Sequence, residues 1–218
     1  QWTRRSMWNR NYSETRLPAI PSTILEILSH QNFADMKLGH DPRFKFTVAR
    51  SVYKSLLKYI SMMHRTDYVV QPLPVTAFSI SENGSRSFRL SWSGIRDPQE
   101  PSANPQGYIV YTRLGYGGWD NGTYVKENSY DFTAEEGLVY SFKVTAVNEG
   151  GESFPSEILS AYHAPLNQGT VLIVNAFDRI SGPTTIETNT DQGFDLNLDP
   201  GIPYQHTPSY CGSQQVFD

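Results

Sequence analysis

Residues 138–159, LVYSFKVTAVNEGGESFPSEIL, decide the fold of the middle of this chain. Apolar side chains recur there at every second position and share one face of an extended backbone; they are Leu138, Tyr140, Phe142, Val144 and Ala146. This period of two predicts a half-buried β-strand. Asn148, Gly150 and Gly151 follow and favour a hairpin turn, because positive φ angles cost these residue types little. The stretch therefore predicts two antiparallel strands of a β-sandwich.

Further strand-like runs surround this hairpin and complete the sandwich. They cover residues 75–81, 88–93, 107–113, 123–126, 129–133 and 157–162. Turn residues separate them, notably Asn83-Gly84 and Asp120-Asn121-Gly122. Pro72 and Pro74 stiffen the connector in front of the first strand. We assign residues 67–165 to a sandwich of two antiparallel sheets and expect a mainly β fold with α/β flanks.

Residues 1–66 predict a strand followed by a helix. The strand-like run covers residues 19–28, which are rich in β-branched and apolar side chains. The helix begins with Asp41 as N-cap and Pro42 in its first turn. Its apolar side chains repeat every four residues, at Phe44, Val48, Val52, Leu56 and Ile60. One strand is too little to cover such a stripe, so residues 1–66 are interpreted as the C-terminal part of a larger α/β domain.

Residues 166–218 predict the start of a third domain. Residues 170–177, TVLIVNAF, form a continuous apolar run, which is typical of a parallel-sheet strand covered on both faces. The polar stretch that follows has no periodicity, so this flank is interpreted as a partial α/β segment. It contains Cys211, the one cysteine of the chain, which excludes an internal disulfide and is expected to be a buried or incidental thiol.

Composition favours an extracytoplasmic protein. The 218 residues include 13 Tyr, 11 Phe and 14 Pro, which suits a secreted, periplasmic or cell-surface β protein. No apolar run reaches the roughly 20 residues of a membrane span. Basic residues gather in the first 66 positions without interleaved aromatic residues, so a nucleic-acid partner is not expected. Because Gln1 is not an initiator methionine, we expect the chain to be an excised or processed piece.

The middle of the chain resembles a fibronectin type III domain. The residues that carry this resemblance are Trp92 in LSW, Tyr108 and Tyr111 in GYIVYT, and Tyr140 in YSFKVTAVNEGGES. The resemblance implies that Trp92 lies in the core and that Tyr140 ties a corner of the sheet. It also implies a spacer or adhesion module, since function belongs to sites rather than to this fold.

The first flank resembles the C-terminal end of zinc-dependent N-acetylmuramoyl-L-alanine amidases. Residues 21–26, PSTILE, are followed by the polar stretch SHQNFADM and the helix VARSVYKSLLKYI. The resemblance implies that Glu26 acts beside zinc as a general acid and base in a parent protein that cleaves muramoyl–peptide amides of peptidoglycan.

The metal ligands of that family lie upstream of this strand, and no histidine precedes Pro21. Ile27-Leu28 also stands where the family favours Gly-Phe. We therefore expect this piece to hold no metal and to be non-catalytic. Glu26 is either catalytic in the parent or paired with one of four arginines (Arg4, Arg5, Arg10 or Arg16). His30 is either a binding residue or a loop hydrogen-bonder, and Asp35 is expected to be a helix cap.

The order of the three parts resembles large secreted Bacteroidetes proteins labelled xanthan lyases, so a polysaccharide lyase-like parent is one alternative. Another is an extracellular adhesion or carbohydrate-binding scaffold with peptidoglycan or polysaccharide as its partner. In that case Trp119, which glycines flank on both sides, is the candidate binding residue. Its ring either stacks on a sugar or folds back over the end of the sandwich.

Overall fold

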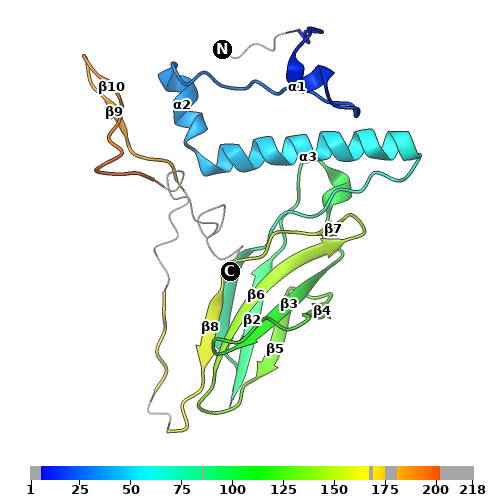
Figure 1. Cartoon of the computed structure of the whole chain (residues 1–218). Helices are drawn as coiled ribbons and strands as arrows, with labels where there is room; N and C mark the ends of the chain where they lie inside the picture. The colour runs from blue at the N-terminus through cyan, green and yellow to red at the C-terminus, as the bar shows by residue number, and fades with distance from the viewer. Residues whose placement is uncertain (1–5, 85, 167–168, 175–180, 202–218) are drawn as a thin grey trace.

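The computed structural model describes residues 6–84, 86–166, 169–174 and 181–201. Cys211, the predicted arginine partners Arg4 and Arg5, and the end of the 170–177 run lie outside these residues. Figure 1 shows a helical N-terminal section, a β-sandwich and a small hairpin. The helices are α1 (Ser13–Arg16), α2 (Phe33–Gly39) and α3 (Pro42–His64), with a 3-10 turn at Pro101–Ala103.

The sandwich consists of two antiparallel sheets. One has the order β1-β2-β5, with β1 at Thr76–Glu82, β2 at Ser87–Ser93 and β5 at Ser129–Thr133. The other has the order β4-β3-β6-β7, with β8 also paired to β6. Its strands are β3 (Gly107–Leu114), β4 (Thr123–Val125), β6 (Val139–Asn148), β7 (Gly151–Glu152) and β8 (Leu159–Tyr162). The predicted mainly β sandwich is confirmed.

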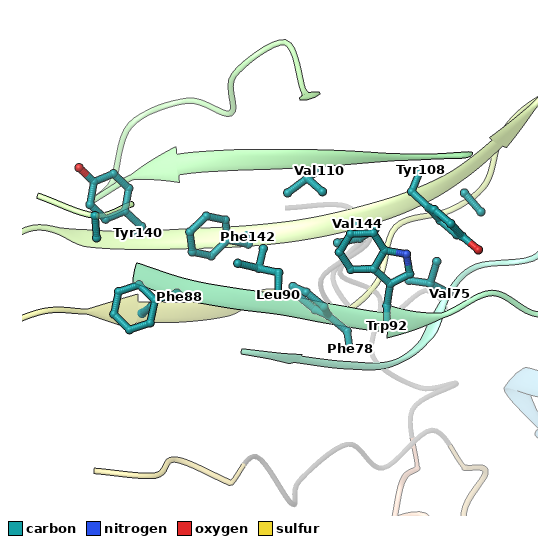
Figure 2. Packing of buried hydrophobic residues seen from close by; sticks show 13 residues of the cluster. Val75, Phe78, Phe88, Leu90, Trp92, Tyr108, Val110, Tyr140, Phe142 and Val144 are labelled. Carbon is teal, nitrogen blue, oxygen red and sulfur yellow. The ribbon is translucent and has the colours of Figure 1, made fainter. Parts of the chain in front are cut away.

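The core lies between the two sheets and contains the residues that the alternation singled out. Tyr140, Phe142, Val144 and Ala146 of β6 all point inward and are buried, and Figure 2 shows most of this cluster. Trp92 packs edge-on against Tyr108, with ring centroids 5.4 Å apart. The prediction of a core tryptophan is therefore confirmed.

Tyr140 also ties the corner that precedes its strand. Its hydroxyl accepts a hydrogen bond of 3.4 Å from the backbone N–H of Glu135, in the turn between β5 and β6. Tyr111, by contrast, sits on the opposite face of β3 from Tyr108, because adjacent side chains alternate across a strand. Of the tyrosines in GYIVYT, only Tyr108 belongs to the core cluster.

Helix α3 begins where the sequence predicts. The carboxylate of Asp41 accepts a hydrogen bond of 2.9 Å from the backbone N–H of Arg43, and Pro42 occupies the first turn. The helix ends at His64, where Arg65 adopts a left-handed conformation with φ of 55°. No helix among the described residues is long and apolar enough to cross a membrane.

Asp35 is not the cap of helix α2, as the sequence suggested. Asn32 is the N-cap, because its side-chain oxygen accepts hydrogen bonds from Ala34 N–H and Asp35 N–H. Asp35 lies within the first turn, and its carboxylate instead accepts a hydrogen bond of 2.8 Å from Ser29 N–H.

Two predicted strands are wrong as paired elements. Residues 19–28 form no strand, and Ile24, Leu25 and Ile27 are exposed. Residues 171–174 are likewise unpaired, and each of these apolar side chains is at least 73% exposed. A strand needs a hydrogen-bonding neighbour, and the described residues place none beside either run. A hairpin that the sequence did not predict follows, made of β9 (Thr185–Glu187) and β10 (Gln192–Phe194).

Candidate functional site

Glu26 lies in the irregular segment between α1 and α2 and is exposed. Neither Arg10 nor Arg16 pairs with it, and no hydrogen bond or ion pair reaches it from any described residue. Two of the four arginine partners suggested by the sequence are therefore not used. Glu26 is left as a solvated carboxylate beside exposed apolar neighbours.

Glu26, His30 and Asp35 do not assemble a metal centre. His30 is exposed in the turn before α2, and the carboxylate of Asp35 is engaged by Ser29 N–H. Within the described ranges, no three His, Cys, Asp or Glu side chains gather to hold a metal ion. The described residues therefore do not fit zinc, which requires three or four converging ligands.

Helix α3 presents two different faces. One face packs against the sandwich and carries Phe46, Arg50, Tyr53, Lys54 and Leu57. The other carries apolar side chains that stay exposed; we call it the bare stripe, and it consists of Val52, Leu56, Tyr59, Ile60 and Met63. Side chains at these spacings share one side of a helix, so the stripe is a continuous apolar surface.

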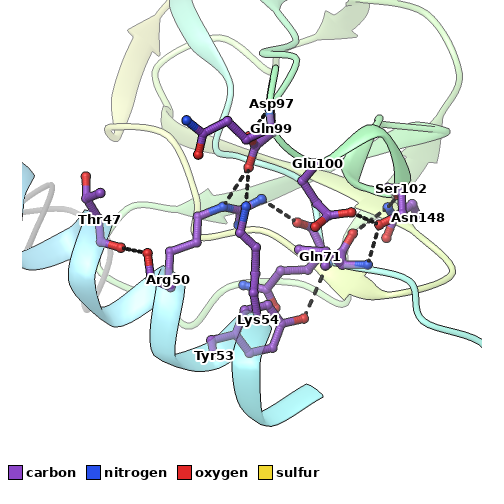
Figure 3. A network of polar contacts seen from close by, with 12 residues as sticks. Thr47, Arg50, Tyr53, Lys54, Gln71, Asp97, Gln99, Glu100, Ser102 and Asn148 are labelled. Atoms are coloured by element: carbon purple, nitrogen blue, oxygen red, sulfur yellow. Dashed lines mark hydrogen bonds and ion pairs between the residues drawn. The ribbon is translucent and has the colours of Figure 1, made fainter. Parts of the chain in front are cut away.

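The face toward the sandwich holds a buried carboxylate. Asp97, on the connection between β2 and β3, accepts hydrogen bonds from Arg50 Nε at 3.1 Å and Lys54 Nζ at 3.3 Å (Figure 3). The side chains of Asp97 and Arg50 are each only 10% exposed. Burial alone would raise the pKa of Asp97. The hydrogen bonds from Gln99 N–H, Arg50 and Lys54 outweigh this effect, so the pKa lies below its ordinary value.

The connector between α3 and β1 is tied down on both sides. Gln71 donates its N–H to the hydroxyl of Tyr53 at 3.3 Å and offers its carbonyl to Arg50 Nη2 at 3.2 Å. Val70 is fully buried, its N–H donates to Ser102 Oγ, and its carbonyl accepts from Asn148 Nδ2 at 2.9 Å. Every polar backbone group of these two residues is thus satisfied by the helix or by the loops of the sandwich.

Trp119 folds back onto the outer face of the sheet. Its ring lies between the guanidinium of Arg113, 4.7 Å from the ring centroid, and the ammonium of Lys143, at 4.3 Å. Trp119 thus folds back onto the sandwich, but onto the outer face of a sheet and not over its end. The aromatic residue at the tip of this loop is Tyr116, which is fully exposed. Its flanking glycines, Gly115 and Gly117, are the signal that could have identified it.

A second polar cluster occupies the same outer face. Tyr111 Oη and Thr145 Oγ1 both donate to Glu152 Oε1, each over 2.7 Å. Burial, followed by the hydrogen bond to Glu152 and its negative charge, raises the pKa of Tyr111 to about 12. The phenol is therefore held as a neutral donor.

An open, shallow hollow lies between α2 and the β9–β10 hairpin. Lys37 Nζ and Glu187 Oε1 form an ion pair of 2.9 Å across it. Phe194 packs against Phe33 at 5.4 Å and edge-on against His40 at 4.8 Å. Burial and then the charge of Lys45 lower the pKa of His40. The sequence did not predict this site, because 150 positions separate the two residues of the ion pair.

A family model described as the fibronectin type III domain matches residues 73–162. A stretch of 79 residues is 40% identical to an Aedes aegypti protein described as a receptor-type tyrosine-protein phosphatase, mosPTP-1. That stretch makes up 34% of this chain and only 6% of the mosquito protein.

Among solved structures, the chain is similar to the titin kinase with its flanking domains, at 22% identity and a TM-score of 0.38, covering 44% of this chain and 18% of that one. The C. elegans twitchin kinase region matches at 21% identity and a TM-score of 0.38, covering 43% of this chain and 17% of that chain. The FN1–FN3 domains of chicken CNTN1 match at 16% identity and a TM-score of 0.38, covering 45% of this chain and 34% of that chain.

Proposed function

We propose that this chain, whose residues 73–162 form a fibronectin type III domain, is a rigid connecting section of a larger extracytoplasmic protein. The observation that carries the proposal is the contact of α3 with the loops of the sandwich, centred on Asp97. Contacts between domains of one chain are usually polar and allow motion. Here a nearly buried ion pair and a fully satisfied connector fix one orientation.

The packing of α3 also decides which surfaces remain open to partners. The loops at this end of the sandwich hold Asp97, Ser102 and Asn148, and all three bond to α3 or to its connector. This end is therefore used within the chain. A partner of the scaffold would meet the outer sheet faces or the opposite end, where Tyr116 is exposed.

Spin labels on the two sections test the rigid connection. Nitroxides at Lys58→Cys on α3 and Tyr116→Cys at the far end of the sandwich, in a Cys211→Ser background, should give one narrow distance distribution by pulsed electron resonance. Adding Arg50→Gln and Lys54→Gln should broaden it, since both side chains bond to Asp97. Arg43→Gln with Lys45→Gln, both exposed on α3, is the matched control. A broad distribution in the unaltered interface would refute the proposal.

A second function, amide hydrolysis in cell-wall peptidoglycan by the full-length protein, is favoured by the setting of Glu26. Its carboxylate has no partner among the described residues, and the bare stripe of α3 offers a surface for the rest of an α/β domain. A carboxylate so placed can take a proton from an attacking water and pass it to the leaving amide nitrogen. Zinc ligands would have to come from elsewhere in that protein.

Substitution of Glu26 in the full-length protein tests this function. Glu26→Gln should lower the rate of muramoyl–peptide cleavage by about two to four orders of magnitude while leaving the melting temperature unchanged. Glu14→Gln, an equivalent change in the same section, should have no effect on the rate. Equal rates for Glu26→Gln and the unaltered protein would remove the assignment.

A further inference from the structure

We propose that Asn83 is a site of spontaneous modification, at which the side-chain amide is converted to a carboxylate through a cyclic imide. Two Asn-Gly pairs lie in connections between strands of the sandwich, Asn83-Gly84 and Asn121-Gly122, and both asparagines are exposed. A glycine after an asparagine leaves its own backbone nitrogen unshielded, because glycine has no Cβ. The fold distinguishes the two pairs. This inference goes beyond the connecting role proposed above and does not depend on it.

The reaction needs water as its only co-reactant. The backbone nitrogen of Gly84 loses its proton to the solvent and attacks Cγ of Asn83. The new N–C bond closes a cyclic imide, and the Cγ–Nδ2 bond breaks, so that Nδ2 leaves as ammonia with a proton from the solvent. Water then opens the imide at one of its two carbonyl carbons. The products are aspartate or isoaspartate, and no atom is oxidised or reduced.

The backbone nitrogen of Gly84 is available for this attack. No described residue accepts a hydrogen bond from it, and no described atom lies within 4 Å of the position that a Cβ of Gly84 would take. The turn is closed by a hydrogen bond of 2.7 Å from Asn83 N–H to the Ser87 carbonyl. The returning bond, from Ser87 N–H to the Gly84 carbonyl, is long at 3.5 Å. Gly84 can therefore rotate toward the amide without disturbing a packed contact.

The side chain of Asn83 is held by a single weak restraint. Its Nδ2 donates a hydrogen bond of 3.1 Å to Asp131 Oδ1, and both residues are exposed. Water can replace a bond between exposed groups at little cost. Asp131 also keeps its two hydrogen bonds from Arg89, of 2.8 and 2.6 Å, when Asn83 turns away. The amide carbon of Asn83 can thus approach the Gly84 nitrogen.

The second pair is locked by contrast. Gly122 N–H donates a hydrogen bond of 2.9 Å to Asp120 Oδ1, and the same oxygen accepts one of 3.0 Å from Thr112 N–H. Hydrogen bonds to a carboxylate are stronger than those between neutral groups. Gly122 is also packed on the sheet, since an added Cβ would lie 2.9 Å from Cε1 of the Tyr111 ring. The loop must open before Asn121 can react.

Modification of Asn83 would weaken the β1–β2 hairpin. A carboxylate at position 83 cannot donate to Asp131 and brings a second negative charge beside it. Isoaspartate also lengthens the backbone of the turn, which disturbs the bond between Asn83 N–H and the Ser87 carbonyl. The site therefore changes the edge of the sheet as the protein ages.

Peptide mapping of the aged protein tests the proposal. The whole chain is incubated in mildly alkaline buffer made with heavy-oxygen water and is then digested with trypsin. The two pairs fall in separate peptides, residues 66–86 and 114–126, and each contains a single asparagine. Mass spectrometry then measures incorporated label, which marks an imide opened during ageing. Asn83 should react at least about tenfold faster than Asn121, and Asn83→Gln should abolish label in the first peptide.

Two comparisons show whether the fold causes the difference. In concentrated urea the two pairs should react at similar rates, because neither nitrogen is then held. In the folded protein, Asp120→Ala should speed the reaction of Asn121 by about tenfold, since it removes the acceptor of Gly122 N–H. Glu127→Ala, an exposed carboxylate in the following turn, is the matched control and should leave that rate unchanged. Circular dichroism checks that both variants fold.

Three results would overturn the proposal. The first is a reaction at Asn83 that is no faster than that at Asn121 in the folded chain. The second is a difference that persists in urea, which would assign it to the neighbouring sequence. The third is an Asn121 rate that Asp120→Ala does not change.

Discussion

Asp97 and Arg50 meet through a hydrogen bond of 3.1 Å, although 47 positions separate them in the chain. Both side chains are nearly buried, and Lys54 contacts the same carboxylate oxygen. Because a buried charge without a partner is costly, each residue depends on the other. This pair ties α3 to the connection between β2 and β3.

Removal of the carboxylate should destabilise the protein. Asp97→Ala removes the carboxylate that accepts from both Arg50 and Lys54, and we expect a loss of about 1–3 kcal/mol in the free energy of unfolding in urea. Asp131→Ala is the matched control, since its partner Arg89 is half exposed and such pairs contribute about 1 kcal/mol at most. Equal losses in both variants would contradict the expectation that the buried Asp97 contributes more to stability than the exposed Asp131.

The pH dependence of the same carboxylate has a defined sign. The folded-state pKa of Asp97 is lowered, so its contribution is complete above the unfolded value of about 3.9 and is lost as pH falls through the folded value. Melting temperatures measured from neutral pH down into this acid range should fall more steeply for the unaltered protein than for Asp97→Asn. Parallel curves would show that Asp97 gains nothing from its partners.

The core prediction concerns Phe142. This side chain is fully buried and packs 4.9 Å from the ring of Phe132, so Phe142→Ala should cost about 3–5 kcal/mol in urea unfolding. Val139→Ala on the same strand is the control, because Val139 is 44% exposed. That change should cost less than about 1 kcal/mol.

Tyr111 should make the protein sensitive to alkali. Its pKa is raised to about 12 in the folded state, so the stability it confers is complete below the unfolded value of about 10 and disappears as pH rises toward 12. Tyr111→Phe should reduce the loss of melting temperature across this interval. Tyr116→Phe, at a fully exposed position, should leave the loss unchanged.

Gly150 should not tolerate a side chain. A Cβ at this position would lie 2.5 Å from the backbone carbonyl oxygen of Val69, and neither group can move without disturbing the connector. Gly150→Ala should therefore lower the melting temperature by several degrees, whereas Gly118→Ala, where no atom lies within 4 Å, should not. Similar melting temperatures would mean that the connector is looser than its hydrogen bonds indicate.

The sandwich and α3 could be predicted because their signals are local. The alternation through Phe142 and the N-cap at Asp41 each act within a few residues. The strand expected at residues 19–28 was wrong because pairing depends on a neighbour that sequence pattern alone does not supply. The short β9–β10 hairpin has no periodic pattern long enough to detect.

The candidate sites were harder to predict for the same reason. The exposed position of Glu26 follows from its surroundings, and the ion pair between Lys37 and Glu187 joins residues that lie 150 positions apart. Trp119 was a candidate binding residue from its sequence, but its contacts with Arg113 and Lys143 depend on the register of two strands. Turn residues predict the position of a loop in the sequence, but they do not predict which residues the side chains of the loop contact.

The residues that hold α3 also limit how freely this module can be shuffled during evolution. Asp97 and Ser102 lie between strands, and Asn148 ends β6, so none belongs to the hydrophobic core. Recombination that replaced the whole sandwich by a homologous one would keep the fold but lose the hydrogen bonds that hold α3 and its connector. An exchange of core side chains alone would keep the contacts with α3. In this protein the attachment of the helix therefore depends on the loops and not on the core.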